Sequence, residues 1–212
     1  MEGKNKTQPK PHKKSGIENE KKWKIDHLPP KKYLNDPVQI VQGYLSRTPK
    51  EVVAYRSEND LNYAYLQVQD RAGTVWKKRI PLDLLIAFDD NKRAPFERRL
   101  RIAGDRCYFT IKSLFGGQHR TEWEKEIPSW VFDLLIGYTV GKQVKKLRYK
   151  VLHGRFTLEF DQYQQPEGKF SLECEFKSER EESLLVFPSW VTKLNPVEVT
   201  ADSAWKNSNL AC

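Results

Sequence analysis

The spacing of apolar positions predicts a chain built mainly from short β-strands. From Ile17 onward, apolar and polar residues alternate over short segments that end in turn residues, such as those at 103–105 and 116–117. Alternation with a period of two places successive side chains on opposite faces of a sheet. The pattern therefore predicts a mainly β (α+β) fold with antiparallel strands and a few helices.

Two segments have a helical spacing of apolar residues. In 129–138, Trp130, Leu134 and Tyr138 fall on one stripe, and Ser129 after a proline is the expected N-cap. In 81–90, leucine and isoleucine side chains also share one face. Residues 36–42 are expected to form only a short turn.

Residues 48–95 stand apart from the rest of the chain. Segments 62–69 and 74–80 are expected to form two strands joined by a turn at 70–73, followed by the helix at 81–90. A hairpin alone is marginal in water, so this insertion should dock on the main domain or on a partner chain. We expect it to shape substrate choice or oligomer contacts and to supply no metal ligand.

Composition narrows the class of protein. Aromatic residues make up 12% of the 212 residues, which argues against wholesale disorder. Residues 1–16 carry five lysines and no hydrophobic period, so they are expected to form a disordered basic tail ahead of a domain at 17–212. The longest apolar run, at 84–88, is too short to cross a bilayer. With no apolar leader near residue 1, a cytoplasmic location without membrane contact is expected.

The balance of charges points to a polyanionic partner. The chain has 37 Lys and Arg against 28 Asp and Glu, a net charge of +9. The three cysteines, Cys107, Cys174 and Cys212, have no paired spacing and are interpreted as reduced thiols.

Like charges recur two residues apart on several of the expected strands. Arg99 and Arg101 form such a basic pair, and Glu173 and Glu175 form an acidic one. Each pair falls on one face of its strand, where like charges repel unless something binds them. Carboxylate pairs suit a divalent cation and basic pairs suit phosphate oxygens, so a barrel with these faces inward would bind a metal–polyphosphate complex. The ordinary alternative is the wet face of an antiparallel sheet.

At these residues the chain resembles the CYTH superfamily, the triphosphate tunnel metalloenzymes. The similar motifs, in chain order, are ExExK at 18–22, QGYLS at 42–46, RxR at 99–101, TIK at 110–112, RxExE at 120–124, KxRY at 146–149, acidic pairs at 159–161 and 173–175, and EVT at 198–200. The resemblance covers 17–47 and 96–212. It departs from the family at 48–95, which short members lack, and at 196–197, where Pro-Val replaces an expected glycine.

The resemblance implies a closed, eight-stranded antiparallel tunnel barrel with a charged interior, covered by a few helices. It implies two Mg²⁺ or Mn²⁺ ions per site, held by Glu18, Glu20, Glu122, Glu124, Asp161, Glu173 and Glu175. It implies a phosphate cradle of Lys22, Arg99, Arg101, Lys112, Arg120, Lys146 and Arg148. Glu18, Glu20 and Lys22 are the implied catalytic residues.

The expected function is metal-dependent hydrolysis of inorganic tripolyphosphate or an organic triphosphate, with water attacking the terminal phosphorus. The same cradle would serve an adenylate cyclase that forms cyclic AMP and pyrophosphate from ATP, so this alternative stays open. A second alternative is a non-catalytic module that binds polyphosphate or RNA ends. Buried glutamates would repel such a ligand, which favours the enzyme. Nucleic-acid binding through the basic tail is not favoured, and a homodimer is left open.

Overall fold

The computed structural model describes residues 19–61, 63–89, 96–113, 122–139 and 141–212. The predicted basic tail at 1–16 lies outside these residues. Two antiparallel sheets make up most of the described chain, so its fold is mainly β, as the alternation predicts.

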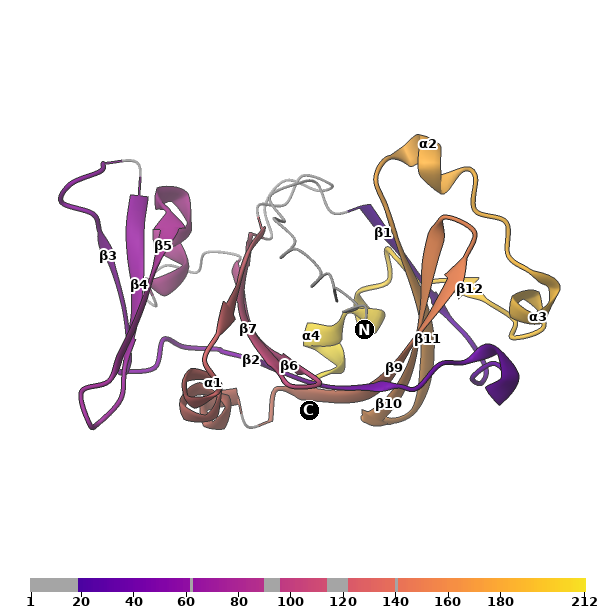
Figure 1. The fold of residues 1–212 in the computed structure, drawn as a ribbon, viewed down its shortest axis with the longest axis horizontal. Helices are drawn as coiled ribbons and strands as arrows, with labels where there is room; N and C mark the ends of the chain where they lie inside the picture. Colours follow the sequence, from indigo (N-terminus) through magenta and orange to yellow (C-terminus); the bar gives the residue numbers. More distant parts are fainter. Residues whose placement is uncertain (1–18, 62, 90–95, 114–121, 140) are drawn as a thin grey trace, which may run out of the picture.

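The larger sheet has nine strands in the order β12-β1-β11-β10-β9-β2-β6-β7-β8. Their bounds are β1 Asn19–Lys24, β2 Val38–Tyr44, β6 Phe96–Ala103, β7 Arg106–Ser113, β8 Glu122–Ile127, β9 Gln143–His153, β10 Phe156–Gln165, β11 Glu167–Phe176 and β12 Val197–Glu198. The sheet curves strongly, and the short helix α4 (Asn207–Leu210) lies on its concave side (Figure 1). The strand at 38–44 corrects the expectation of a mere turn at 36–42.

The expected closed barrel of eight strands is not what the described strands form. The nine-stranded sheet ends at β12 and at β8, and no pairing within the described residues joins these two ends. The segments next to β1 and β8, residues 1–18 and 114–121, are not described. The sheet is therefore open over the part of the chain that can be followed, and its closure stays a prediction.

The two faces of the sheet differ as the alternation predicts. Phe109 and Ile111 of β7 are buried on the convex face, while Thr110 and Lys112 lie on the concave face. The same division runs through β10 and β11, where Leu158, Phe160, Leu172, Cys174 and Phe176 form an apolar cluster on the convex side. The polar residues of both strands consequently face into the curve.

Short helices cover the convex face. The helix α1 (Ser129–Ile136) packs on β6 and β7, and α3 (Ser189–Thr192) adds Val191 to the cluster over β10 and β11. Pro128, not Ser129, occupies the N-cap position of α1, and no side chain caps that end, which corrects the expected cap. The remaining helical segments are α2 (Glu179–Glu182) and the 3₁₀ turns η1 (Lys31–Tyr33), η3 (Gly137–Thr139) and η4 (Ser203–Trp205).

The QGY segment needs its glycine for packing. A Cβ built on Gly43 would lie 2.2 Å from the Thr139 hydroxyl, so β2 can approach η3 only with glycine there. No helix in the described part of the chain is long and apolar enough to cross a membrane.

Residues 48–95 build the smaller sheet. Its order is β3 (Val52–Arg56), β4 (Tyr63–Gln69) and β5 (Val75–Pro81), and the 3₁₀ helix η2 (Leu82–Phe88) follows. Two of these strands were expected, and β3 was missed. Leu66, Ile80 and Leu84 share one apolar cluster with Leu100 and Phe109 of the larger sheet, so this segment docks on the main domain.

The cysteines are free thiols, as expected. Cys107 and Cys174 are buried, and Cys212 is exposed. Burial raises the pKa of Cys174 to about 12, which keeps it a neutral packing residue.

Candidate active site

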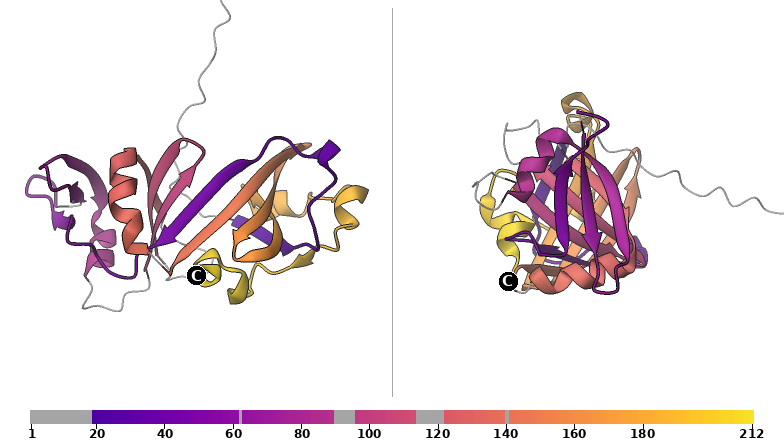
Figure 2. Two further views of the ribbon diagram at one scale, coloured as in Figure 1. Left: turned by 90° about the horizontal axis from the view of Figure 1, so that it is seen from below. Right: turned by 90° about the vertical axis from the view of Figure 1, so that its left-hand side faces the viewer.

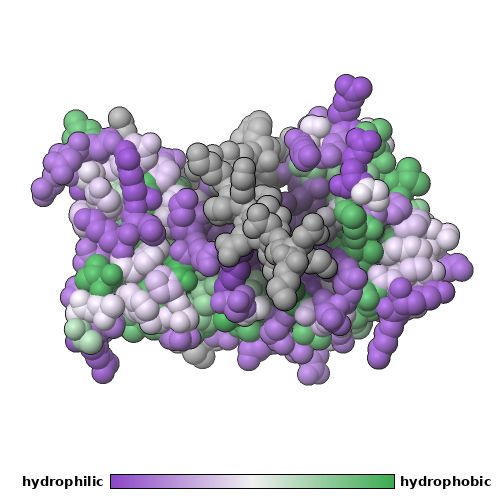
Figure 3. Space-filling model, viewed as in Figure 1, coloured by the Kyte–Doolittle hydropathy of each residue, from purple (hydrophilic) through white to green (hydrophobic). Residues whose placement is uncertain are grey.

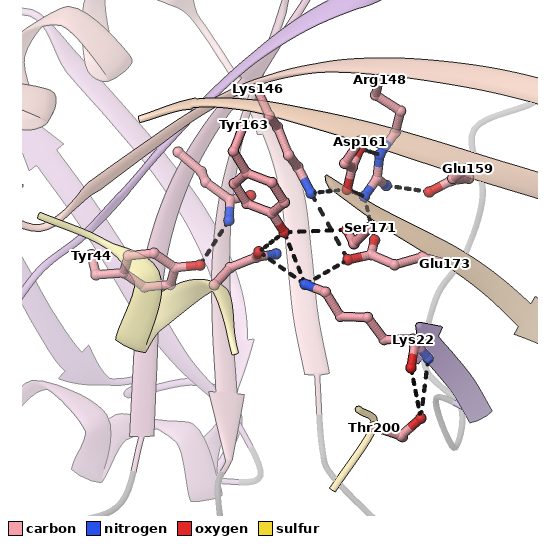
Figure 4. Close-up of polar contacts among 12 residues, drawn as sticks. Lys22, Tyr44, Lys146, Arg148, Glu159, Asp161, Tyr163, Ser171, Glu173 and Thr200 are labelled. Carbon is pink, nitrogen blue, oxygen red and sulfur yellow. Dashed lines mark hydrogen bonds and ion pairs between the residues drawn. The ribbon is translucent and has the colours of Figure 1, made fainter. Parts of the chain in front are cut away.

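A group of paired charges lies on the concave face of β1, β9, β10 and β11 (Figure 4). The Arg148 guanidinium donates through Nε and Nη2 to the two oxygens of Asp161, at 2.7 and 2.6 Å. Lys146 Nζ lies 2.5 Å from Asp161 Oδ2, and both of these side chains are almost fully buried. Lys22 Nζ lies 3.0 Å from Glu173 Oε1, and Arg148 also pairs with Glu173. This group brings together three predicted phosphate ligands and two predicted metal ligands.

These contacts fix the charges of the group. Burial acts to raise the pKa of the Glu173 carboxyl, but the neighbouring cations, first Lys146 and then Lys22, hold that pKa well below its usual range. Burial alone would lower the pKa of Lys22, and the charge of Glu173 reverses this and raises it. Both side chains are therefore charged at neutral pH.

Tyr163 and Asn207 complete the surroundings of Lys22. The Lys22 ammonium donates to the Tyr163 hydroxyl at 2.9 Å and to Asn207 Oδ1 at 3.3 Å, while Tyr163 donates to Asn207 at 2.8 Å. Asn207 begins α4, whose Leu210 packs on Val144 and Tyr163. Sequence reasoning did not single out Tyr163, although it lies two positions beyond Asp161 on the same strand face.

A second charged group lies on the concave face of β6, β7 and β8. Arg101 Nη2 donates to Glu124 Oε1 at 2.9 Å, and Arg99 Nη2 lies 3.8 Å from Glu122. Lys112 Nζ lies 3.4 Å from Glu122 Oε2. The motifs at 99–101, 110–112 and 122–124 thus meet on three neighbouring strands, as the resemblance implies.

Two arginine N–H donors of this second group have no described acceptor. The Nε atoms of Arg99 and Arg101 are buried, and no described atom accepts a hydrogen bond from either. Burial lowers the pKa of Arg101, and the charges of Arg99 and Arg148 act in the same direction. Arg148 belongs to the first group, so the two groups act on one another electrostatically. Buried N–H donors without acceptors and mutually repelling guanidinium groups are the environment that an anion would stabilise.

Gln42 and Tyr44 of β2 lie on the same face. Gln42 Nε2 donates to the Tyr44 hydroxyl at 2.8 Å, and both residues are buried. Burial is the main cause that raises the pKa of Tyr44 well above its usual value, so this hydroxyl stays neutral. Neither residue was expected in the site, although both belong to the QGYLS motif.

Relatives of known name identify the family. The chain is 35% identical over 127 residues, 59% of its own length and 75% of the relative's, to an inorganic triphosphatase of Acetivibrio thermocellus. The chain belongs to the CYTH superfamily. It is also 36% identical to an inorganic triphosphatase of Nitrosomonas europaea, over 54% of this chain and 74% of that one. No family model matches the sequence.

A solved CYTH structure shares the fold. The crystal structure of the protein NE1496 superposes with a TM-score of 0.51 and 25% sequence identity, over 92% of this chain and 97% of that one. A second crystal structure, of the inorganic triphosphatase NE1496, gives the same TM-score at 24% identity and supports the fold alone.

The described carboxylates expected to hold metal lie on β1, β8, β10 and β11. Asp161, Glu173, Glu122 and Glu124 each form ion pairs with the cations described above. Glu20 and Glu175 lie directly opposite one another in the register of β1 and β11. No cluster of three or more metal-binding side chains occurs among the described residues. Two carboxylates together with substrate phosphates suffice for Mg²⁺, so the Glu20–Glu175 pair fits a hard divalent ion.

Two of the expected site residues lie outside the described chain. Glu18, an expected catalytic residue and metal ligand, and Arg120, an expected phosphate ligand, are in the undescribed ranges 1–18 and 114–121. Every other expected ligand is on the concave face of the larger sheet.

Proposed function

We propose that the protein hydrolyses a triphosphate-containing substrate, inorganic tripolyphosphate or an organic triphosphate, on the concave face of the larger sheet. The observation that carries the proposal is that the Nε donors of Arg99 and Arg101 are buried without a described acceptor. These arginines share the concave face with the cations Lys22 of β1 and Lys146 and Arg148 of β9. The named relatives, both inorganic triphosphatases, support the same reaction.

The chain's own residues would bind and orient the polyphosphate. Arg99 and Arg101 would each turn a guanidinium edge toward phosphate oxygens, where parallel in-plane N–H donors match the geometry of the ligand. Lys22 and Lys146 would add point charges from the other side of the curve. In the balanced reaction, water attacks the terminal phosphorus and the bond from that phosphorus to the bridging oxygen breaks. Orthophosphate and the diphosphate-containing remainder, pyrophosphate in the case of tripolyphosphate, are released, and the proton of the attacking water passes to solvent.

We further propose that Glu20 and Glu175 hold Mg²⁺ or Mn²⁺. When bound, such an ion would neutralise phosphate charge and lower the pKa of a nearby water. The expected closed tunnel belongs to the same proposal. Strands β1 and β8, near the two ends of the open sheet, both carry acidic residues on the concave face, and closure would bring like charges together unless cations and substrate lie between them.

The test compares tripolyphosphate, ATP and thiamine triphosphate as substrates, each with Mg²⁺, Mn²⁺ and EDTA. Orthophosphate and cyclic AMP are measured separately. The expected result is metal-dependent release of orthophosphate, lost in EDTA. Cyclic AMP as the main product from ATP would replace hydrolysis with the cyclase reaction, and binding without turnover would make the protein a polyphosphate-binding module.

A further inference from the structure

The smaller sheet exposes one face made of tyrosines and cations. Tyr55 of β3, Tyr63 and Tyr65 of β4, and Lys77 and Arg79 of β5 alternate with the residues that enter the shared apolar cluster, and we call these five residues the tyrosine face. The sheet lies at one end of the molecule, and no helix or strand of the described residues lies in front of it (Figure 2, right). The tyrosine face therefore points away from the concave site.

The five side chains form a continuous layer. Tyr55 and Tyr65 are register partners, and their ring centroids are 5.9 Å apart. Lys77 Nζ lies 4.1 Å from the centroid of the Tyr65 ring and 5.1 Å from that of Tyr55. The guanidinium carbon of Arg79 lies 3.2 Å from the Tyr63 centroid. Each ring thus has a cation over it.

Folding alone does not account for this face. The apolar side chains that hold the small sheet in place, such as Leu66 and Ile80, are on its other face and are fully buried. On the tyrosine face the rings are only partly buried, and Val53 and Val75 beside them keep about half of their surface exposed, at 52% and 49%. A contiguous group of exposed aromatic and apolar side chains bordered by cations is a feature of interaction sites.

The charge of the edge strand favours an anionic partner. Lys77 and Arg79 are exposed cations of the tyrosine face on β5, which forms one edge of the smaller sheet, whereas Lys78 between them projects from the opposite face. Arg79 forms an ion pair with Asp60, so it is partly neutralised, whereas Lys77 lies over two neutral rings. The chain as a whole carries a net charge of +9.

We propose that the tyrosine face binds single-stranded nucleic acid. Unpaired bases stack on aromatic rings whatever their sequence, and neighbouring cations contact the phosphates. The charged ends of Lys77 and Arg79 are exposed and can leave the rings for phosphates while bases take their place. Binding requires no triphosphate and is independent of hydrolysis on the concave face.

The test measures the anisotropy of a fluorescent 12-nucleotide single strand with a 5′-hydroxyl end, titrated with the full chain in EDTA and excess tripolyphosphate. The variants are Tyr55→Leu/Tyr65→Leu and Lys77→Ala. Lys32→Ala is the matched control, because Lys32 is also an exposed lysine over a tyrosine, 4.9 Å from the Tyr33 centroid in η1.

The tyrosine variant should raise Kd by at least about fivefold for each base that loses its ring. Lys77→Ala should weaken binding severalfold and reduce the salt slope by about one, with Lys32→Ala unchanged. A duplex of the same sequence should bind more weakly than the single strand. Lys77→Ala alters no buried packing, so its result stands even where the tyrosine variant fails to fold.

Three results would overturn the proposal. They are wild-type affinity in both variants, complete displacement of the strand by tripolyphosphate, or a change in oligomeric mass by light scattering with no change in nucleic-acid binding. The last result would assign the face to a second copy of the chain. None of these results would bear on triphosphate hydrolysis, which is assayed with small substrates.

Discussion

The ammonium group of Lys22 and the hydroxyl of Tyr163 are hydrogen-bonded at 2.9 Å, although 141 positions separate them in the chain. Lys22 is on β1 and Tyr163 is on β10, with β11 between them in the sheet. Asn207 of α4 accepts a hydrogen bond from each of these two groups, so the orientation of Lys22 depends on three distant parts of the sequence.

Tyr163→Phe should therefore lower kcat by about tenfold while the fold is kept, because it removes the hydroxyl that accepts from Lys22 and donates to Asn207 and leaves the ring in place. Asn207→Ala should have a similar effect. The double variant should cost less than the two single changes added together, since both act through Lys22. The control is Tyr149→Phe, on the convex side of β9. Fully additive effects in the kinetics would contradict this role for Tyr163.

Glu20→Gln should reduce turnover by on the order of 100-fold or more, because it removes one carboxylate of the proposed metal pair at nearly constant volume. The apparent affinity for Mn²⁺, followed by activity against metal concentration, should fall as well. Glu126→Gln is the matched control, since Glu126 pairs with Arg106 and both are exposed. Unchanged metal dependence in Glu20→Gln would remove Glu20 from the metal site.

Arg101→Ala should act mainly on substrate binding. Arg101 is on β6 and pairs with Glu124 of β8, and its buried Nε has no described acceptor. Losing one charge-assisted contact to phosphate should raise KM by about tenfold with a smaller change in kcat. Steady-state kinetics with tripolyphosphate measure this, with Arg106→Ala as the control. A fall in kcat at constant KM would assign Arg101 to the transition state instead.

The buried ion pairs also govern stability. Asp161 is fully buried between Lys146 and Arg148, so Asp161→Asn leaves two cations short of a partner. The free energy of unfolding in urea should fall by about 3–5 kcal/mol. Asp26→Asn, at an exposed position, should change it by less than about 0.5 kcal/mol. A loss below about 1 kcal/mol in Asp161→Asn would mean that Glu173 alone satisfies both cations.

Acid should weaken the same group through Glu173. An unfolded glutamate has a pKa near ~4.3, and the pKa of folded Glu173 is lowered well below its usual value by Lys146, Lys22 and Arg148 against the opposing effect of burial. The ionised carboxylate thus stabilises the fold above about pH 4.3, and this contribution is lost as the pH falls through the folded pKa. Urea unfolding in EDTA should show a steeper loss of stability below about pH 4.3 in the wild type than in Glu173→Gln. Glu167→Gln, exposed at the start of β11, should behave as the wild type.

Local pattern predicted the concave face well, because strand alternation alone decides which side chains share a face. Alternation placed Arg99 and Arg101 on one face of their strand, and the family resemblance added Lys112 from another strand. In the structure Arg99 and Lys112 both pair with Glu122. The contacts of Tyr163 with Asn207 could not be predicted, since they depend on how β10 and α4 come together in space. The pairing of Asp161 and Glu173 with cations was also missed, because spacing along a strand says nothing of the charge on the neighbouring strand.

In the insertion, too, local pattern predicted some elements and missed one that depends on its partner strand. Its apolar content predicted strands and docking, and both are present. Strand β3 was missed because Val52–Arg56 is too short and too mixed in polarity to be recognised without its partner β4. Replacing 48–95 with a short Gly/Ser linker would expose the buried side chains of Leu100 and Phe109, so such a variant needs polar substitutions at both positions.

The shared apolar cluster couples the local unfolding of the two sheets. Leu66, Ile80 and Leu84 of the insertion are as completely buried as Leu100 of the larger sheet, and all four belong to one apolar cluster. Amide hydrogens of β4 and β6 should therefore exchange with solvent at matching rates in the slowest class, rather than the small sheet opening first. A nucleic acid bound to the tyrosine face would then slow amide hydrogen exchange in both sheets at once. Binding at one end of the molecule would thus reduce local opening of the strands that carry the proposed active site.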